Sequence, residues 1–167
     1  MSELRVGIGV DAHAFSDEAK LVLGGVELSG RGLAGHSDGD VVSHALIDAI
    51  LGAAGLEDIG ALFPSEDAQW EGASSLDLLR RVYDDAQEAG WELVNADCVL
   101  IGEEPRIAPV RDEVRERLSG VLGVGVDRIT VRATTTDRLG FTGREEGIAA
   151  TASATIRLPW SDKDWSA

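Results

Sequence analysis

The sequence predicts one α/β domain in which helices pack on one face of a sheet. First, strand-like segments alternate along the chain with segments whose apolar residues recur at helical spacing. Second, the chain has 167 residues, 44% of them hydrophobic, which is enough for one substantial core. Third, no linker or internal repeat divides residues 1–158, which we expect to be a single domain. The polar segment 159–167 is expected to be a tail outside it.

The strands are predicted from apolar or alternating segments rich in β-branched residues. The four long ones are residues 5–14, 91–101, 128–136 and 148–157. Residues 21–28 are predicted to form a short hairpin that turns at Gly24 and Gly25. The glycine-rich segment 29–35 that follows is expected to be a mobile connection.

Three helices are predicted from helical spacing of apolar residues. The first spans residues 40–54 and ends before Gly55, with Ser37 and Asp40 forming a capping box at its start. Its polar face, opposite an apolar stripe directed at the core, is expected to hold Asp40, His44 and Asp48. The other two helices are predicted at residues 74–89 and 109–121. The polar segment 65–72 is predicted to be a loop and is a candidate lid.

Composition excludes several classes of protein. Fifteen basic and thirty acidic residues give a net charge of −15, which argues against non-specific binding to nucleic acids or anionic membranes. The single cysteine, Cys98, excludes an intrachain disulfide and is expected to be a buried structural thiol. The N-terminal residues lack the features of a signal peptide, and the longest uncharged apolar run, 49–56, is too short to span a bilayer. We therefore expect a cytoplasmic protein.

A first group of residues has the composition of a metal site. Asp11 and His13 lie two apart in a predicted strand, so both project to the same face. His44 lies in the first predicted helix. One carboxylate and two imidazoles suit a catalytic zinc site with an open position. The alternative is that His13 only forms a hydrogen bond with Asp11 at the strand end and that His44 is an ordinary helix residue.

A second group of residues has the composition of a phosphate site. Residues 128–144 contain four arginines and one aspartate, a net charge of +3 within an acidic chain. Thr134, Thr135 and Thr136 follow one another at the predicted strand end, and a loop with glycines and arginines comes next. Such a segment can hold a phosphorylated ligand, and Asp137 could bind a second cation such as Mg²⁺. The alternative is that threonine favours strands and that arginines often decorate loops.

Taken together, the motifs resemble one known family. Asp-x-His at 11–13, Gly-His-Ser-Asp-Gly-Asp at 35–40 and His44 are followed by Asp-Ile-Gly-x-Leu-Phe-Pro at 58–64. Residues 133–147 then contain Ala-Thr-Thr-Thr-Asp-x-Leu-Gly-Phe-Thr-Gly-Arg-x-Glu-Gly. This order closely resembles the 2-C-methyl-D-erythritol 2,4-cyclodiphosphate synthases of the non-mevalonate isoprenoid pathway. The resemblance extends over residues 5–157, nearly the whole chain.

The resemblance implies a specific reaction. The substrate would be 4-diphosphocytidyl-2-C-methyl-D-erythritol 2-phosphate, whose 2-phosphate attacks the β-phosphorus so that the cyclic diphosphate forms and CMP leaves. It implies Zn²⁺, or a similar divalent cation, on Asp11, His13 and His44, and Mg²⁺ or Mn²⁺ as a second metal on Asp137. It also implies a homotrimer whose sites lie between subunits. Many family members have glutamate where this chain has Asp137.

The resemblance also implies roles for individual residues. His36 and Thr135 match the residues that position the transition state. The residues matched to the erythritol moiety and its covering loop are Ser37, Asp58, Gly60, Phe63, Pro64, Ser65, Glu66 and Asp67. The residues matched to the nucleotide side are Pro105, Arg106, Thr134, Thr136, Phe141 and Arg144. Glu103 and Glu104 depart from the family pattern there, because two carboxylates near a nucleotide would repel it unless they face away.

Two other functions are weighed against cyclisation. One is a non-catalytic module on the same fold that binds a nucleotide or an isoprenoid diphosphate, but such a module would be expected to lose a metal ligand or His36. The other is a zinc phosphodiesterase, which needs a base to activate water near the metal. Only Asp38 and Asp40 are close enough in sequence to supply that base.

Overall fold

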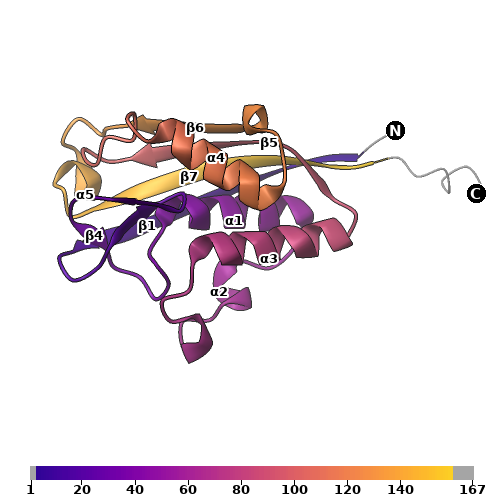
Figure 1. Ribbon diagram of the computed structural model, residues 1–167, viewed down its shortest axis with the longest axis horizontal. Coiled ribbons are helices and arrows are strands. Elements are labelled where there is room, and N and C mark those ends of the chain that lie inside the picture. The colour runs from indigo at the N-terminus through magenta and orange to yellow at the C-terminus, as the bar shows by residue number, and fades with distance from the viewer. Residues whose placement is uncertain (1–2, 160–167) are drawn as a thin grey trace, which may run out of the picture.

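In the computed structural model, which describes residues 3–159, a five-stranded sheet carries the long helices on one face (Figure 1). The strand order is β4-β1-β7-β5-β6, and every pair is antiparallel except β5 with β6. A separate hairpin is formed by β2 and β3, as predicted for residues 21–28. The strands are β1 Glu3–Ser16, β2 Leu21–Leu23, β3 Val26–Leu28, β4 Gly32–Leu33, β5 Glu92–Ile101, β6 Ile129–Thr134 and β7 Gly147–Leu158.

Three long helices form the second layer. They are α1 Val41–Ala54, α3 Ser75–Glu88 and α4 Arg111–Leu122. α1 packs on β1 and β7, α4 packs on β6, and α3 lies against both of these helices. The short helices are α2 Ile59–Leu62 and α5 Gly140–Gly143, and single 3-10 turns occur at Ala68–Trp70 and Val126–Arg128. The prediction of an α/β fold with helices on one face of the sheet is confirmed.

Two glycines of β1 allow α1 to lie directly on the sheet. A Cβ atom at Gly7 would be 1.9 Å from the carbonyl oxygen of Ala49, and one at Gly9 would be 1.9 Å from that of Ala45. Any side chain at either position would therefore push the helix outward. The close packing brings the first turn of α1 beside the second half of β1, where the predicted metal ligands are.

The predicted division of α1 into a polar and an apolar face is wrong, because the sheet and α3 together cover almost the whole helix. Asp40 is fully buried and is itself the N-cap, with Oδ1 accepting a hydrogen bond from the Ser43 amide at 3.1 Å. The predicted capping box that began at Ser37 is therefore also wrong. Gly39 has a φ of 70°, and this turn places Asp40 rather than Ser37 at the start of the helix.

Three further boundaries differ from the prediction. The segment 29–35 is not simply a loose connection, because β4 within it pairs with Phe15 and Ser16. The strand predicted at 128–136 ends at Thr134, so Thr135 and Thr136 lie in the turn that leads to α5. The third helix begins at Arg111, after Pro109. The candidate lid contains the 3-10 turn Ala68–Trp70, which Asp67 caps by accepting a hydrogen bond from the Gln69 amide.

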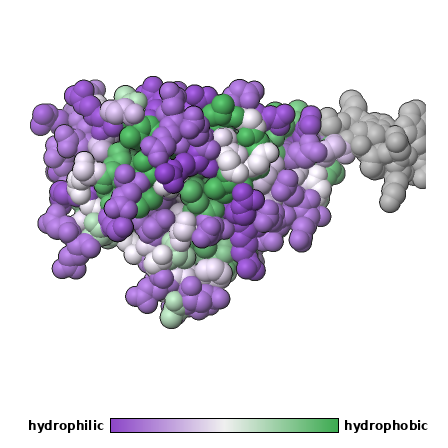
Figure 2. Space-filling view, viewed as in Figure 1, coloured by the Kyte–Doolittle hydropathy of each residue, from purple (hydrophilic) through white to green (hydrophobic). Residues whose placement is uncertain are grey.

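The face of the sheet that the helices leave uncovered has an apolar row. On the face away from the helices, β1 exposes an apolar row formed by Leu4, Val6, Ile8 and Val10, which are 63–71% exposed. The side of the molecule that carries α4 is mostly hydrophilic, with hydrophobic residues in patches between the elements (Figure 2). A monomeric protein rarely leaves such a continuous apolar row in water.

The remaining expectations concern Cys98, membranes and the tail. Cys98 is buried in β5, and burial raises the pKa of its thiol to about 12, so its predicted burial is confirmed. Within residues 3–159, none of the helices has the length and apolar character needed to cross a membrane. Of the predicted tail, residues 160–167 lie outside the described part of the chain, and the domain boundary at 158 stays a prediction.

Candidate metal centre and active site

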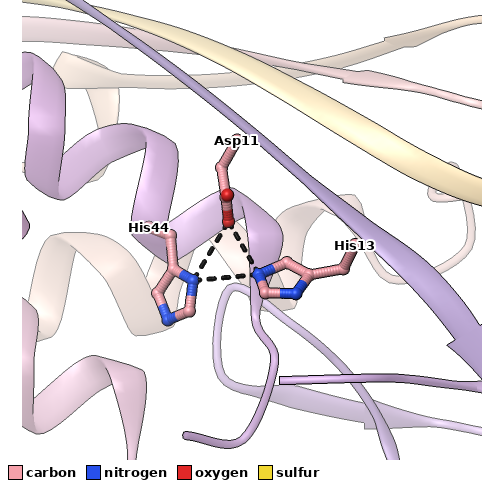
Figure 3. Close-up of side chains that lie close together, drawn as sticks. All are labelled: Asp11, His13 and His44. Carbon is pink, nitrogen blue, oxygen red and sulfur yellow. Dashed lines mark hydrogen bonds and ion pairs between the residues drawn. The ribbon is translucent and has the colours of Figure 1, made fainter. Parts of the chain in front are cut away.

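Three predicted ligands, Asp11, His13 and His44, converge at one point (Figure 3). The first two project from one face of β1, and His44 projects from the first turn of α1. Asp11 Oδ2 lies 2.8 Å from His13 Nε2 and 3.0 Å from His44 Nδ1, and the two ring nitrogens are 3.1 Å apart. Among the residues described, this is the one group of three or more His, Cys, Asp or Glu side chains close enough to share a metal ion.

The hydrogen-bond pattern allows both imidazoles, when neutral, to direct a lone pair at the carboxylate. His13 Nδ1 donates to the carbonyl oxygen of Ala34, so its Nε2 carries the lone pair of a neutral ring. His44 Nε2 faces the hydroxyls of Ser37 and Ser75 at 3.0 and 2.9 Å, which leaves Nδ1 directed at the carboxylate. At these distances the three atoms are held together either by a proton that a ring donates to the carboxylate or by a metal ion bound among them. Ligands 2.0 Å from a tetrahedral zinc ion would be about 3.3 Å apart, close to the spacing seen.

The electrostatics of the group favour the ionised carboxylate that a metal needs. Burial by itself would raise the pKa of Asp11, but hydrogen bonds from His13 and His44 outweigh it and hold this pKa well below its usual range. Burial would lower the pKa of His13, and its hydrogen bond with Asp11 raises it overall. The same carboxylate that stabilises a proton on the ring would stabilise a metal cation in the same place.

A pocket of about 180 Å³ opens directly onto the two histidines. Its polar wall consists of His13, His36, Ser37, His44 and Ser65, and its other wall is formed by Ile59, Gly60, Phe63, Trp70 and Leu78. His36 Nε2 donates to the carbonyl oxygen of Asp67 at 3.2 Å, so the candidate lid is attached to the pocket through this ring. Ser37, Gly60, Phe63 and Ser65, which the resemblance implied, therefore lie next to the metal ligands.

Other residues implied for the erythritol side do not line this pocket. Asp58 caps α2, with its Oδ1 accepting a hydrogen bond from the Ala61 amide at 2.9 Å. Asp67 caps the 3-10 turn of the lid. Pro64 and Glu66 belong to the same loop but do not line the pocket.

A second pocket, of about 310 Å³, is lined by some of the residues that the resemblance implied for nucleotide binding. Pro105, Arg106, Thr134 and Thr135 line it together with Glu103. Its lining shares no residue with the pocket at the metal ligands. Glu103 Oε1 accepts a hydrogen bond from the backbone amide of Arg138, and this contact holds the carboxylate at the edge of the pocket.

The other residues implied for the nucleotide side lie elsewhere. Thr136 Oγ1 donates to the carbonyl oxygen of Leu139, which holds the turn before α5. Asp137 has a φ of 51° and accepts a hydrogen bond from Thr135 Oγ1 at 3.4 Å. Phe141 lies beside Ala12, His13 and Glu146 in a different depression. Arg144 is paired with Glu146 at 2.8 Å.

Sequence reasoning missed Trp70 and Ser75. Trp70 forms part of the pocket wall and contacts Phe63 edge to face, with ring centroids 5.0 Å apart. Its only sequence signal is an aromatic residue within a polar loop. Ser75 falls at the start of the predicted helix 74–89, and nothing in its neighbourhood in the sequence points toward His44, which lies 31 residues earlier.

A sequence profile decides the family. The profile of the YgbB family matches residues 4–157, which is nearly all of the chain. The chain belongs to the YgbB family.

Relatives and solved structures agree with this membership. The bifunctional enzyme IspD/IspF of Nitrobacter hamburgensis is 50% identical over 165 residues, which cover 98% of this chain and 41% of that protein. The structure of the bifunctional IspDF from Campylobacter jejuni has a TM-score of 0.92 at 41% identity, and the match covers 95% of this chain and 43% of that one. A 2C-methyl-D-erythritol-2,4-cyclodiphosphate synthase solved in its CDP-bound form has a TM-score of 0.83 at 34% identity, with 91% and 99% covered.

The relatives differ from this chain in length. The chain spans about two fifths of the length of the curated relatives that it matches. It corresponds to almost the full length of the CDP-bound synthase. The YgbB-family region is thus a unit that occurs both within longer proteins and as a chain of its own size.

Proposed function

We propose that this chain converts 4-diphosphocytidyl-2-C-methyl-D-erythritol 2-phosphate into 2-C-methyl-D-erythritol 2,4-cyclodiphosphate and CMP, as an isoprenoid-precursor enzyme. The observation that carries the proposal is the group Asp11, His13 and His44 facing a pocket that also contains His36. In the reaction an oxygen of the 2-phosphate attacks the β-phosphorus of the diphosphate. The new P–O bond closes the ring while the bond to the CMP oxygen breaks.

The site's main task is to position two phosphates against each other. The nucleophile is already ionised, so no strong base has to activate it, and proximity and neutralisation of charge account for the acceleration. A divalent cation held by the three ligands, Zn²⁺ in our proposal, would supply Lewis-acid stabilisation of the phosphate oxygens. Mg²⁺ or Mn²⁺ held through Asp137 would act on the nucleotide side. His36 and Thr135 would position the reacting groups from the two pockets.

The pocket disfavours hydrolysis. Phe63, Trp70 and Leu78 give one wall an apolar surface, which limits the access of water. Neither predicted base is available to activate water. Asp40 is fully buried and its two carboxylate oxygens accept four hydrogen bonds. Asp38 is occupied by the amide and hydroxyl of Ser75. These contacts support cyclisation over the phosphodiesterase alternative.

Phosphorus NMR of the purified chain with the cytidine substrate tests the proposal. We expect the substrate signals to be replaced by those of the cyclic diphosphate and of CMP in equal amounts. A protein that binds the substrate and leaves it unchanged would instead be the non-catalytic module. Appearance of CMP together with the open-chain 2,4-bisphosphate, in which water has taken the place of the CMP oxygen, would identify a phosphodiesterase. We also propose that the enzyme acts in the cytoplasm, where its one cysteine, Cys98, would stay reduced.

We further propose a homotrimer with sites shared between subunits. Two observations support it. The pocket at the metal ligands and the pocket at Thr135 share no lining residue within one chain, and a site shared between subunits would bring the two kinds of lining to one substrate. The exposed row on β1 also offers an apolar surface that an oligomer would cover.

Sedimentation equilibrium tests the assembly. The wild type should have about three times the 17.6 kDa mass of one chain. Ile8→Glu places a charge in the exposed row and should yield monomers. Val126→Glu is a matched control, because Val126 is also exposed but lies on a 3-10 turn away from that row. A monomeric wild type would contradict the proposal.

A further inference from the structure

His44 has a second ring nitrogen that does not face Asp11 or His13. This Nε2 lies 2.9 Å from Ser75 Oγ and 3.0 Å from Ser37 Oγ. The ring carries one proton on this nitrogen when its other nitrogen presents a lone pair. The His44 ring is held more firmly if the hydroxyl that accepts this proton is itself fixed, so the two serines have to be compared.

Ser75 is the better acceptor because its own proton is directed elsewhere. Its Oγ donates to Asp38 Oδ1, and its backbone amide donates to Asp38 Oδ2 at 3.0 Å. An ionised carboxylate only accepts hydrogen bonds, so the hydroxyl proton of Ser75 points at Asp38. The lone pairs of the Ser75 oxygen are then left to accept the Nε2 proton of His44.

The surroundings keep this arrangement in place. Ser75 is fully buried and His44 is 9% exposed, so water does not compete for these hydrogen bonds. Ser75 is the first residue of α3, whereas Asp38 belongs to the loop before α1. The loop is joined to α3 by a further bond from the Asp38 amide to the carbonyl oxygen of Ala73, at 3.1 Å.

We propose that Ser75 and Asp38 are positioning residues for the metal ligand His44. The chain of hydrogen bonds from His44 Nε2 to Ser75 and on to Asp38 fixes the tautomer and the plane of the ring, so that the Nδ1 lone pair points at the metal position. Such outer partners of a ligating histidine commonly change metal affinity by 10–100-fold when they are removed. The inference rests on the metal centre of the proposed function.

The arrangement also gives different roles to Ser75 and Ser37, which both contact His44 Nε2. Because Ser75 accepts the His44 proton, Ser37, whose oxygen accepts a hydrogen bond from the Gly39 amide, does not need to hold the ring and can direct its own proton at a ligand in the pocket that it lines. A ligand could then enter or leave without disturbing the ring of His44.

Metal affinity of the purified protein tests the proposal. Zn²⁺ binding is measured by competition with a chromophoric chelator, and the visible spectrum of the Co²⁺-substituted protein reports the geometry of the site. Ser75→Ala should weaken Zn²⁺ binding at least tenfold and change the Co²⁺ spectrum. Asp38→Asn, which keeps one acceptor oxygen, should have a smaller effect in the same direction. Wild-type affinity and an unchanged spectrum in Ser75→Ala would overturn the proposal.

Ser74→Ala is the matched control. Ser74 is the adjacent serine, it is exposed, and its side chain makes no capping hydrogen bond, so affinity and spectrum should stay as in the wild type. Nitrogen-15 NMR of the Zn²⁺-loaded wild type gives an answer that does not depend on any variant folding. It should show a proton on His44 Nε2 with Nδ1 bound to the metal, and a proton on Nδ1 would refute the inference. None of these measurements uses the cytidine substrate, so they can succeed even where cyclisation fails.

Discussion

Asp40 is expected to hold the helix that carries His44, and its replacement should cost the protein a large part of its stability. Its carboxylate is fully buried and accepts hydrogen bonds from the Gly24 amide at 2.8 Å and the Gly25 amide at 2.7 Å. It also accepts bonds from the amide and the hydroxyl of Ser43, at 3.1 and 2.7 Å. One side chain thus caps α1 and joins it to the hairpin of β2 and β3.

The size of the effect follows from these four bonds. Asp40→Ala leaves the buried amide of Gly24 and the partly buried amide of Gly25 without an acceptor, at about 1–3 kcal/mol each. Loss of the helix cap adds about 1 kcal/mol. We therefore expect the free energy of unfolding to fall by about 4 kcal/mol, near the upper end of single-substitution effects. Asp40→Asn keeps one acceptor oxygen and should lose about half as much.

Urea denaturation followed by circular dichroism measures this change, with all variants at one protein concentration because assembly would add to stability. With a slope of about 2 kcal/mol per molar urea, Asp40→Ala should unfold at about 2 M less urea than the wild type. Asp58→Ala is the matched control, since Asp58 caps the short helix α2 but is exposed. A loss in Asp40→Ala no greater than in Asp58→Ala would refute the reasoning.

Three further predictions concern the chemistry of the site. His44→Ala removes one of three ligands and should lose most of the bound zinc on elemental analysis while circular dichroism stays unchanged; full retention would remove His44 from the site. In water labelled with oxygen-18 the product should carry essentially no label, because the attacking oxygen comes from the substrate, and stoichiometric labelling would favour hydrolysis. Co-refolding inactive His44→Ala and Thr135→Ala chains in equal amounts should restore about a quarter of wild-type activity if each site uses two subunits in a closed ring. No recovery in confirmed mixed trimers would mean that each chain builds its site alone.

Much of the fold could be predicted because it depends on local patterns. The glycines of the β2–β3 hairpin, the alternation in β7 and the left-handed Gly55 after α1 are each visible in a few neighbouring residues. The bounds of α1 were predicted to within one residue, but the residue that caps it was predicted wrongly for a physical reason. Its true cap, Asp40, also binds the amides of Gly24 and Gly25, which lie 16 and 15 residues earlier, and spacing along the chain carries no signal of such a contact.

The sequence by itself determined the alternation of strands and helices, the burial of Cys98, and the identity of Asp11, His13 and His44 as candidate ligands. Those features follow from residue type and from the period of two or 3.6 residues, which any short segment displays. Only the tertiary structure decided that the three ligands meet, because Gly7 and Gly9 must let α1 rest on β1 before His44 can reach Asp11. It alone also brought Ser75 from α3 to the back of the His44 ring. Contacts between residues distant in sequence arise from packing, and packing is set by the whole chain at once.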